Sequence, residues 1–439
     1  MKNKQLLTAF LLLAAQQVLF LAFFPPFTEP DSGGYMDMAL GLLSSGAFPG
    51  DLRLPGYPAL LAFFYKVFGQ TNLPVIIFQH ALGLVVWLLF MKVLETDRQK
   101  LVFSALYFCD LLYNSYQHVV LADFFFSFLL CLSAWLAWLY RREGKPAFLF
   151  LCGLALGFGI LTKPVLKYFP FFILPVFLAD RRPLRSRLAS AAVFLSAPLL
   201  VVNLWSFRNY LDEGRFTLLP LGSYHYIGRA VNFMEFPENS VTKAYFLKHV
   251  AAAPLPRNRK ATAVHAAVED MRAAGLDFAK LGPEFSSIVK LSIMRHPFLY
   301  LKESGIELFY FFFSAHNLYA KNGLKGSLPY SAEQGIRSGN IAGTALKVAV
   351  SLHPFYWAVF LLFIYFITTN AGRILHERDF VVIFLFGLIA YISLVSSMAN
   401  EGLARYRCAI QPFLLFFAAL ALDRLIPPVA AVKRKDGQA

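Results

Sequence analysis

The chain has 439 residues, of which 58% are hydrophobic and 47 are phenylalanine. Soluble domains use roughly 45 to 50% apolar residues, so this composition excludes an ordinary soluble protein and indicates an all-α polytopic membrane protein. The formal net charge of +15 does not indicate a nucleic-acid partner, because much of the excess lies in short connections between apolar segments.

The first apolar segment, residues 6–24, is long enough to cross a bilayer, which takes about 20 residues. No cleavage site of small residues follows it, so we interpret it as a retained helix and not as a signal peptide. The same criterion predicts further spans, about ten in total with the first, at 73–91, 101–119, 121–140, 147–162, 168–179, 188–206, 349–369, 379–398 and 408–425.

Basic residues gather in connections that fall on one side of the membrane under alternating crossings. They lie at 92–100, 141–145, 181–187, 373–378 and 433–435. The positive-inside rule makes this side cytoplasmic and predicts that both termini lie inside. The connection after the first span is then on the outer side.

Three parts are expected along the chain. They are an N-terminal transmembrane module at 1–206 with a first outer loop at 25–58, an outer, mostly helical domain at 207–347, and C-terminal transmembrane helices at 348–439. Within the outer domain, the apolar spacing of 261–272 predicts a helix. Residues 288–313 are apolar and aromatic with interspersed charges, and either lie in the interface or cross the membrane. We prefer the interface, because a crossing would reverse the C-terminal orientation against the Lys and Arg count.

An acidic motif, Glu29-Pro30-Asp31-Ser32-Gly33-Gly34-Tyr35, directly follows the first span. Carboxylates at the membrane border often mark substrate paths, although a single one is also compatible with a solvated loop. A second acid, Asp123, opens the fourth span, where an N-cap is the alternative role. Asp110, inside the third span, is a further candidate.

Five cations are predicted at the outer ends of spans: Arg53, Lys163, Arg208, Arg405 and Arg407. Lys and Arg at helix ends often only extend to the interface. Basic residues on the outer side run against the positive-inside bias, however, and this favours a shared anionic ligand such as a lipid phosphate.

Several motifs occur in an order that resembles a known family. After the acidic motif come Arg-x-Pro-Gly-Tyr-Pro at 53–58, a glycine-rich helix ending in Leu-Thr-Lys-Pro at 161–164, Trp-x-x-Arg-Asn-Tyr at 205–210, and Arg-Tyr-Arg at 405–407. The chain resembles bacterial GT-C glycosyltransferases. More narrowly, it is similar to the branch of lipid A aminoarabinose transferases and protein O-mannosyltransferases, which use polyprenyl-phosphate-linked sugars. The resemblance covers the first 210 residues well and roughly the last 40 moderately.

This resemblance implies a glycosyltransferase of the bacterial inner membrane with a periplasmic active site. It would move one sugar from an undecaprenyl-phosphate-type donor to a hydroxyl of a lipid, polysaccharide or protein acceptor, with inversion. The resemblance assigns the general-base role to Asp31. The other implied roles are orientation of the acceptor or a metal by Glu29 and Asp123, donor-phosphate binding by Arg53, Lys163, Arg208, Arg405 and Arg407, and substrate contacts by Tyr35, Tyr57, Tyr224 and His225.

Three points stay open in the sequence. A divalent metal, Mg²⁺ or Mn²⁺, is compatible with the acids but not required by them. A flippase or transporter of lipid-linked sugars would also need acids and cations at the membrane edge, although internal repeats and interrupted helices are not evident. A ligase or polymerase of whole lipid-linked oligosaccharides would share the fold style.

Overall fold

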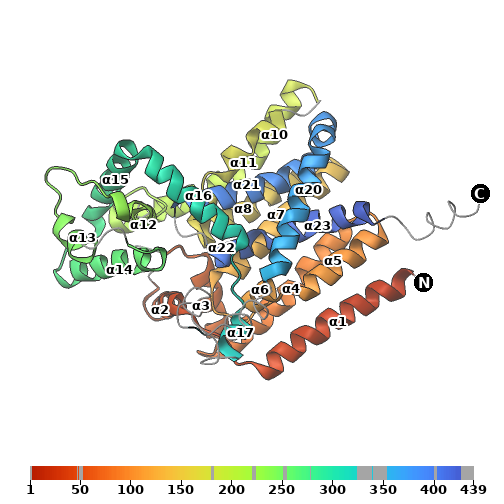
Figure 1. Ribbon diagram of the computed structural model, residues 1–439, viewed down its shortest axis with the longest axis horizontal. Coiled ribbons are helices and arrows are strands. Elements are labelled where there is room, and N and C mark those ends of the chain that lie inside the picture. The colour runs from red at the N-terminus through yellow and green to blue at the C-terminus, as the bar shows by residue number, and fades with distance from the viewer. Residues whose placement is uncertain are drawn as a thin grey trace, which may run out of the picture.

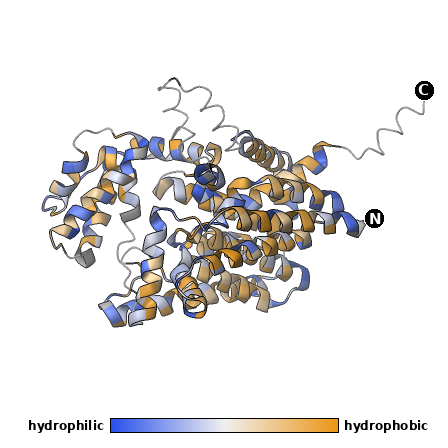
Figure 2. Ribbon diagram, turned by 90° about the horizontal axis from the view of Figure 1, so that it is seen from below, coloured by the Kyte–Doolittle hydropathy of each residue, from blue (hydrophilic) through white to orange (hydrophobic). Residues whose placement is uncertain are grey.

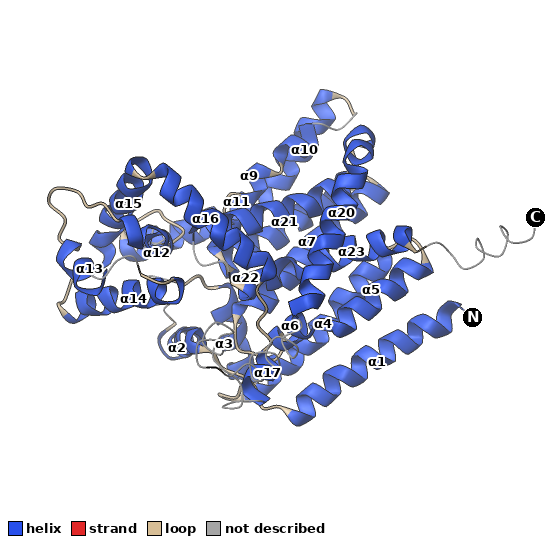
Figure 3. Ribbon diagram, viewed as in Figure 1, coloured by secondary structure: helices blue, strands red, loops and turns tan. Residues whose placement is uncertain are grey.

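The computed structural model describes residues 2–46, 48, 53–178, 182–219, 224–250, 255–276, 278–323, 339, 353–399 and 403–426. Regular structure in these ranges is helical, and the only β-type pairing among them is an isolated bridge between Phe27 and Val119 (Figures 1 and 3). The all-α fold expected from the composition is confirmed.

Within the described ranges, seven helices are long and apolar enough to cross a membrane. They are α1 (Lys2–Phe23), α4 (Leu73–Val93), α7 (Ala122–Glu143), α11 (Leu184–Glu213), α20 (His353–Glu377), α21 (Phe380–Ala399), and the C-terminal run of α22 (Ala404–Arg407), η3 (Cys408–Ile410) and α23 (Gln411–Leu425). Figure 2 shows hydrophobic residues along this bundle. The protein is therefore a multi-pass membrane protein.

The other three predicted spans are shorter or interrupted. The segment at 101–119 divides into α5 (Asp97–Cys109) and α6 (Leu111–Tyr116), because the Asp110 carboxylate accepts a hydrogen bond from the Tyr113 N–H and caps a new helix. The other two are α8 (Pro146–Thr162) and the pair α9 (Phe169–Phe172) and α10 (Leu174–Leu178).

Two glycines let α8 pack closely against α11. A Cβ on Gly153 would clash with the backbone oxygen of Phe194, and one on Gly157 would lie 3.0 Å from the Val201 Cβ. Small residues allow such close approach of membrane helices. This packing fixes the end of α8, from which Lys163 projects.

The expected loop at 25–58 contains two helices. α2 (Pro30–Ser45) begins inside the acidic motif, where proline suits the first helical turn. Gly46 ends it with a φ of 70°, in the left-handed region. α3 (Gly56–Phe68) then starts against the end of α8, since a Cβ on Gly56 would lie 2.5 Å from the Thr162 Oγ1.

A group of helices outside the bundle has its own apolar core. These helices are α12 (Tyr224–Ala230), α13 (Lys243–Val250), α14 (Arg257–Ala273) and α15 (Phe278–Arg295), with the short turn η2 (Val231–Phe233). Ile227, Phe246, Met271 and Phe285 are buried together between them. The helix predicted at 261–272 lies within α14. In Figures 1 and 2 this group lies on the side of the bundle opposite to the start of α1 and the end of α23.

The segment 288–313 is divided at His296 between α15 and α16 (Pro297–Phe313), and neither helix is among the seven spans. α16 contacts α20, α21 and α22. Its outer face exposes Phe298, Leu301 and Phe309, of which Phe298 is 85% exposed. Ion pairs attach α16 to the α12–α15 group. The buried Glu307 carboxylate lies 3.4 Å from Arg229 Nη1 and accepts a hydrogen bond from Arg257 Nε at 2.9 Å. The short α17 (Leu318–Gly323) follows.

Candidate active site

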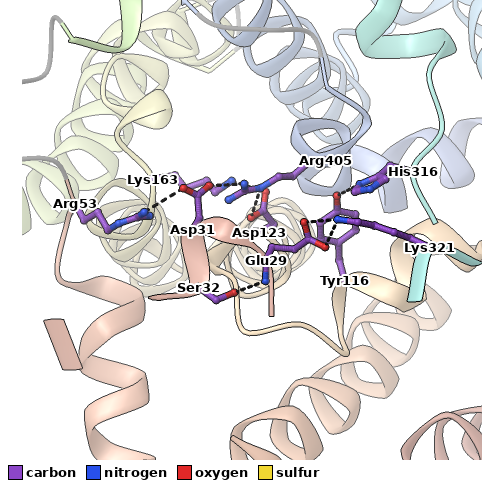
Figure 4. A network of polar contacts seen from close by, with 10 residues as sticks. All are labelled: Glu29, Asp31, Ser32, Arg53, Tyr116, Asp123, Lys163, His316, Lys321 and Arg405. Carbon is purple, nitrogen blue, oxygen red and sulfur yellow. Dashed lines mark hydrogen bonds and ion pairs between the residues drawn. The ribbon is translucent and has the colours of Figure 1, made fainter. Parts of the chain in front are cut away.

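Asp31 lies in the first turn of α2, with each of its carboxylate oxygens paired to an arginine. Arg53 Nη2 is 3.1 Å from Oδ1, and Arg405 Nη1 is 2.5 Å from Oδ2. The side chain of Asp31 is 44% exposed, so the carboxylate remains accessible. It lies at the end of the helix bundle where α7 begins and α8 ends, which we call the bundle mouth. Figure 4 shows Arg53 and Arg405 approaching it from opposite sides.

Asp123 is the buried counterpart of Asp31. Its side chain is 1% exposed, and it accepts from Lys163 Nζ at 2.6 Å and from Arg405 Nε at 3.0 Å. Leu121 occupies the N-cap position of α7, so the alternative N-cap role of Asp123 is wrong. Arg405 therefore bridges two carboxylates that are far apart in the sequence (Figure 4).

Local backbone chemistry explains how these side chains meet. Lys163 precedes a proline, which disfavours helical geometry, and so α8 ends and Lys163 is extended. A Cβ on Gly34 would lie 2.7 Å from Arg53 Nε, so this glycine makes room for the guanidinium. The acidic motif meets three cations, Arg53, Lys163 and Arg405, where α2, α7, α8 and α22 begin or end.

We call Asp31, Arg53, Asp123, Lys163 and Arg405 the charged cluster. Burial alone raises the pKa of Asp31, but the positive charges of Arg405 and Arg53 outweigh burial and lower this pKa to about 2. Three cations face two carboxylates, which leaves one unit of positive charge in excess. Such a cluster is suited to a singly charged anion.

Glu29 lies beside the charged cluster with a partner of its own. Both of its carboxylate oxygens are 2.7 Å from Lys321 Nζ, and its backbone N–H donates to the Ser32 hydroxyl. Close by, Tyr116 and His316 are hydrogen-bonded at 3.0 Å (Figure 4). Sequence reasoning missed Lys321, because it is 292 residues from Glu29 and belongs to no recognisable motif.

The predicted tyrosine contacts have different surroundings. Tyr35 is buried, and the Arg53 guanidinium carbon lies 4.3 Å from the centre of its ring. Tyr57 is fully buried, and its hydroxyl donates to the Gln79 side-chain oxygen at 3.0 Å. Tyr224 and His225 begin α12, and their side chains lie outside the described part of the chain.

Two of the five predicted phosphate-binding cations have partners outside the charged cluster. Arg208 pairs with Asp212, one turn further along α11, at 2.7 Å. Arg407 is 1% exposed and donates to the backbone oxygens of Phe311 and Phe312. It is two residues from Arg405, and side chains at this spacing do not share a helix face.

The acids do not form a metal site as they are arranged. Arg405 lies between Asp31 and Asp123, and Lys321 occupies both oxygens of Glu29. A group of three or more His, Cys, Asp or Glu side chains that could hold an ion is absent from the described residues. A divalent metal bound by both aspartates would have to displace the arginine between them.

Apolar spans and a charged cluster at one end of them define this chain as a multi-pass membrane protein with a polar site at the bundle mouth. Residues 52–205 match the family model described as dolichyl-phosphate-mannose-protein mannosyltransferase. This segment includes α3 to α8 and most of α11, and the match confirms the resemblance to GT-C glycosyltransferases of the protein O-mannosyltransferase branch.

No curated protein matches the sequence significantly. A crystal structure of ArnT from Cupriavidus metallidurans bound to undecaprenyl phosphate aligns with 94% of this chain and 77% of that chain, at 13% identity and a TM-score of 0.40. The apo structure of the same protein aligns with 94% of this chain and 76% of that chain, at 14% identity and a TM-score of 0.42.

Proposed function

We propose that this protein is an integral-membrane glycosyltransferase that transfers one sugar from a polyprenyl phosphate, such as undecaprenyl phosphate, to an acceptor hydroxyl. The observation that carries the proposal is the charged cluster, in which Arg405 joins an accessible and a buried aspartate. A sugar linked to a lipid by a phosphodiester has one negative charge, which matches the excess positive charge of the cluster. The family match over residues 52–205 supports this donor class.

The reaction is a single displacement at the anomeric carbon. The acceptor oxygen forms a bond to this carbon while the bond from the carbon to the phosphate oxygen breaks, and the hydroxyl proton passes to Asp31. The polyprenyl phosphate leaves with an additional negative charge, which Lys163, Arg53 and Arg405 stabilise. One displacement inverts the configuration of the sugar.

The site faces the periplasm in this proposal, and the protein lies in the bacterial inner membrane. Basic residues flank the connections between α4 and α5, α7 and α8, and α20 and α21, mostly in the adjoining helix turns, at the helix ends away from the charged cluster. The positive-inside rule makes that side cytoplasmic. The α12–α15 group is then outside, where it is placed to receive the acceptor, and the exposed apolar face of α16 lies in the membrane interface.

The deciding experiment uses the full chain in nanodiscs with a radiolabelled undecaprenyl-phosphate sugar and a mixture of envelope acceptors. We expect label in an acceptor product whose mass has increased by one sugar. Asp31→Asn should reduce transfer by roughly 100-fold or more, because the base is lost. Asp37→Asn, an exposed carboxylate on the same helix, is the matched control and should transfer normally.

Other outcomes would contradict the proposal in distinct ways. A flippase would leave the label on its lipid carrier, and a ligase or polymerase would add many sugars in one step. Near-normal transfer by a folded Asp31→Asn variant would remove the base assignment.

A further inference from the structure

The two arginines on Asp31 conflict with its role as a base in the resting site. Arg53 occupies Oδ1 and Arg405 occupies Oδ2, so both carboxylate oxygens already accept charged hydrogen bonds. The two arginines lower the pKa of Asp31 to about 2. An efficient base has a pKa closer to the working pH, so the paired carboxylate is a weak base. A hydroxyl can still reach a free lone pair of the exposed carboxylate, but Asp31 becomes a more effective base when one arginine moves away.

Arg405 is built to change partners without leaving the site. Its Nε donates to Asp123, which is buried and also held by Lys163. Its Nη1 donates a second hydrogen bond, to the partly exposed carboxylate of Asp31. Because the guanidinium is planar and rigid, Nη1 can leave Asp31 only when the whole group tilts about the Nε hydrogen bond to Asp123, and this bond keeps the side chain at the same end of the bundle.

We propose that Arg405 is a cation shared between Asp31 and the donor phosphate, and that donor binding draws it from Asp31 and frees this carboxylate for the acceptor hydroxyl. The proposal rests on the proposed function and adds an order to it: the donor binds before the acceptor is deprotonated. Lipid phosphate and Asp31 then compete for the same guanidinium.

The movement of charge during the reaction favours this exchange. As Asp31 accepts the acceptor proton it becomes neutral, and as the bond from carbon to oxygen breaks, the leaving phosphate gains one negative charge. The negative charge held by the charged cluster and its ligand moves from Asp31 to the phosphate and stays constant in total. Arg405, which is 18% exposed and contacts both aspartates, is placed to follow it.

The test measures binding of undecaprenyl phosphate, the leaving carrier, to the full chain in nanodiscs without any sugar transfer. If Asp31 competes for Arg405, Asp31→Asn should bind the lipid phosphate more tightly by roughly fivefold or more. Asp31→Ser should do the same, which covers a folding defect in the first variant. Undecaprenol, which has no phosphate, should show no such gain.

Glu29→Gln is the matched control. It removes one negative charge at the same mouth, but its partner is Lys321 and not Arg405. We expect its affinity for undecaprenyl phosphate to change by less than about twofold. An equal gain in Glu29→Gln and Asp31→Asn would show that general charge repulsion, and not exchange of Arg405, limits binding, and would overturn the proposal.

The remaining outcomes separate this inference from the proposed function. A wild-type protein that binds undecaprenyl phosphate, with Asp31 variants that bind equally or more weakly, overturns the exchange and leaves the donor class intact. A folded wild-type protein that does not bind this lipid at all overturns the donor class, and the exchange with it.

Discussion

Lys163 Nζ lies 2.6 Å from Asp123 Oδ1, and this pair fastens the end of α8 to the start of α7. Lys163→Met should leave the buried carboxylate with Arg405 alone and destabilise the fold by about 3 kcal/mol. Lys163→Arg should recover much of this stability. Thermal unfolding in nanodiscs measures both, with Lys66→Met, an exposed lysine of α3, as the control. Equal melting temperatures for Lys163→Met and wild type would show that the Lys163–Asp123 ion pair does not stabilise the fold.

Two adjacent glycines give a sharper test of the Arg53 position. A Cβ on Gly34 would meet the Arg53 guanidinium at 2.7 Å, whereas one on Gly33 has open space within 4 Å. We expect Gly34→Ala to displace Arg53 and raise the KM for the lipid-linked donor by about threefold or more. Gly33→Ala should match wild type. Identical kinetics in the two variants would mean that Arg53 does not contribute to donor binding.

Substitution of Arg407 should mainly lower stability, whereas substitution of Arg405 should mainly lower the affinity for undecaprenyl phosphate. Arg407 donates to the carbonyls of Phe311 and Phe312 in the last turn of α16, where helical partners are lacking. Arg407→Met should therefore cost about 2 kcal/mol of stability and change the affinity for undecaprenyl phosphate by less than about threefold. Arg405→Met should reduce this affinity by about tenfold or more. Comparable losses of affinity in two equally stable variants would support the predicted phosphate-binding role of Arg407.

Asp31 makes the stability depend on pH in a defined window. Its pKa in the folded protein, about 2, is below the ordinary value of 3.8. The ion pairs therefore stabilise the fold fully above pH 3.8, and this contribution is lost as the pH falls through about 2. The difference in melting temperature between wild type and Asp31→Asn should be constant from about pH 5 to 8 and shrink below about pH 4. A difference that grows on acidification has the wrong sign for this ion pair.

The sequence was informative where a residue type and a helix end coincide. Apolar length predicted the long spans, and the acids and cations at span ends included all members of the charged cluster. The sequence did not predict features that depend on contacts between distant parts of the chain. Asp110 divides one predicted span by capping α6, which a hydropathy pattern does not report. The partner of Glu29 comes from α17, outside any motif.

Arg407 illustrates a further limit. The Arg-Tyr-Arg motif places two arginines at the same depth, but only the short turn of α22 determines that they point to different partners. The sequence prediction gave both arginines one anionic ligand because both lie on the outer side, against the positive-inside bias. The separation depends on α16, a helix that begins about 110 residues earlier in the chain.

α16 contacts charged residues at two places along its length, through Glu307 near its middle and through the backbone of its last turn, which binds Arg407. Glu307 binds Arg229 and Arg257 from the outer helices, and the next turn presents the carbonyls that hold Arg407. α16 is thus one of the elements, together with α21, through which the α12–α15 group meets the bundle, and its last turn holds an arginine two residues from Arg405. We therefore expect a displacement of the α12–α15 group to shift α16 and, through Arg407, the backbone next to Arg405.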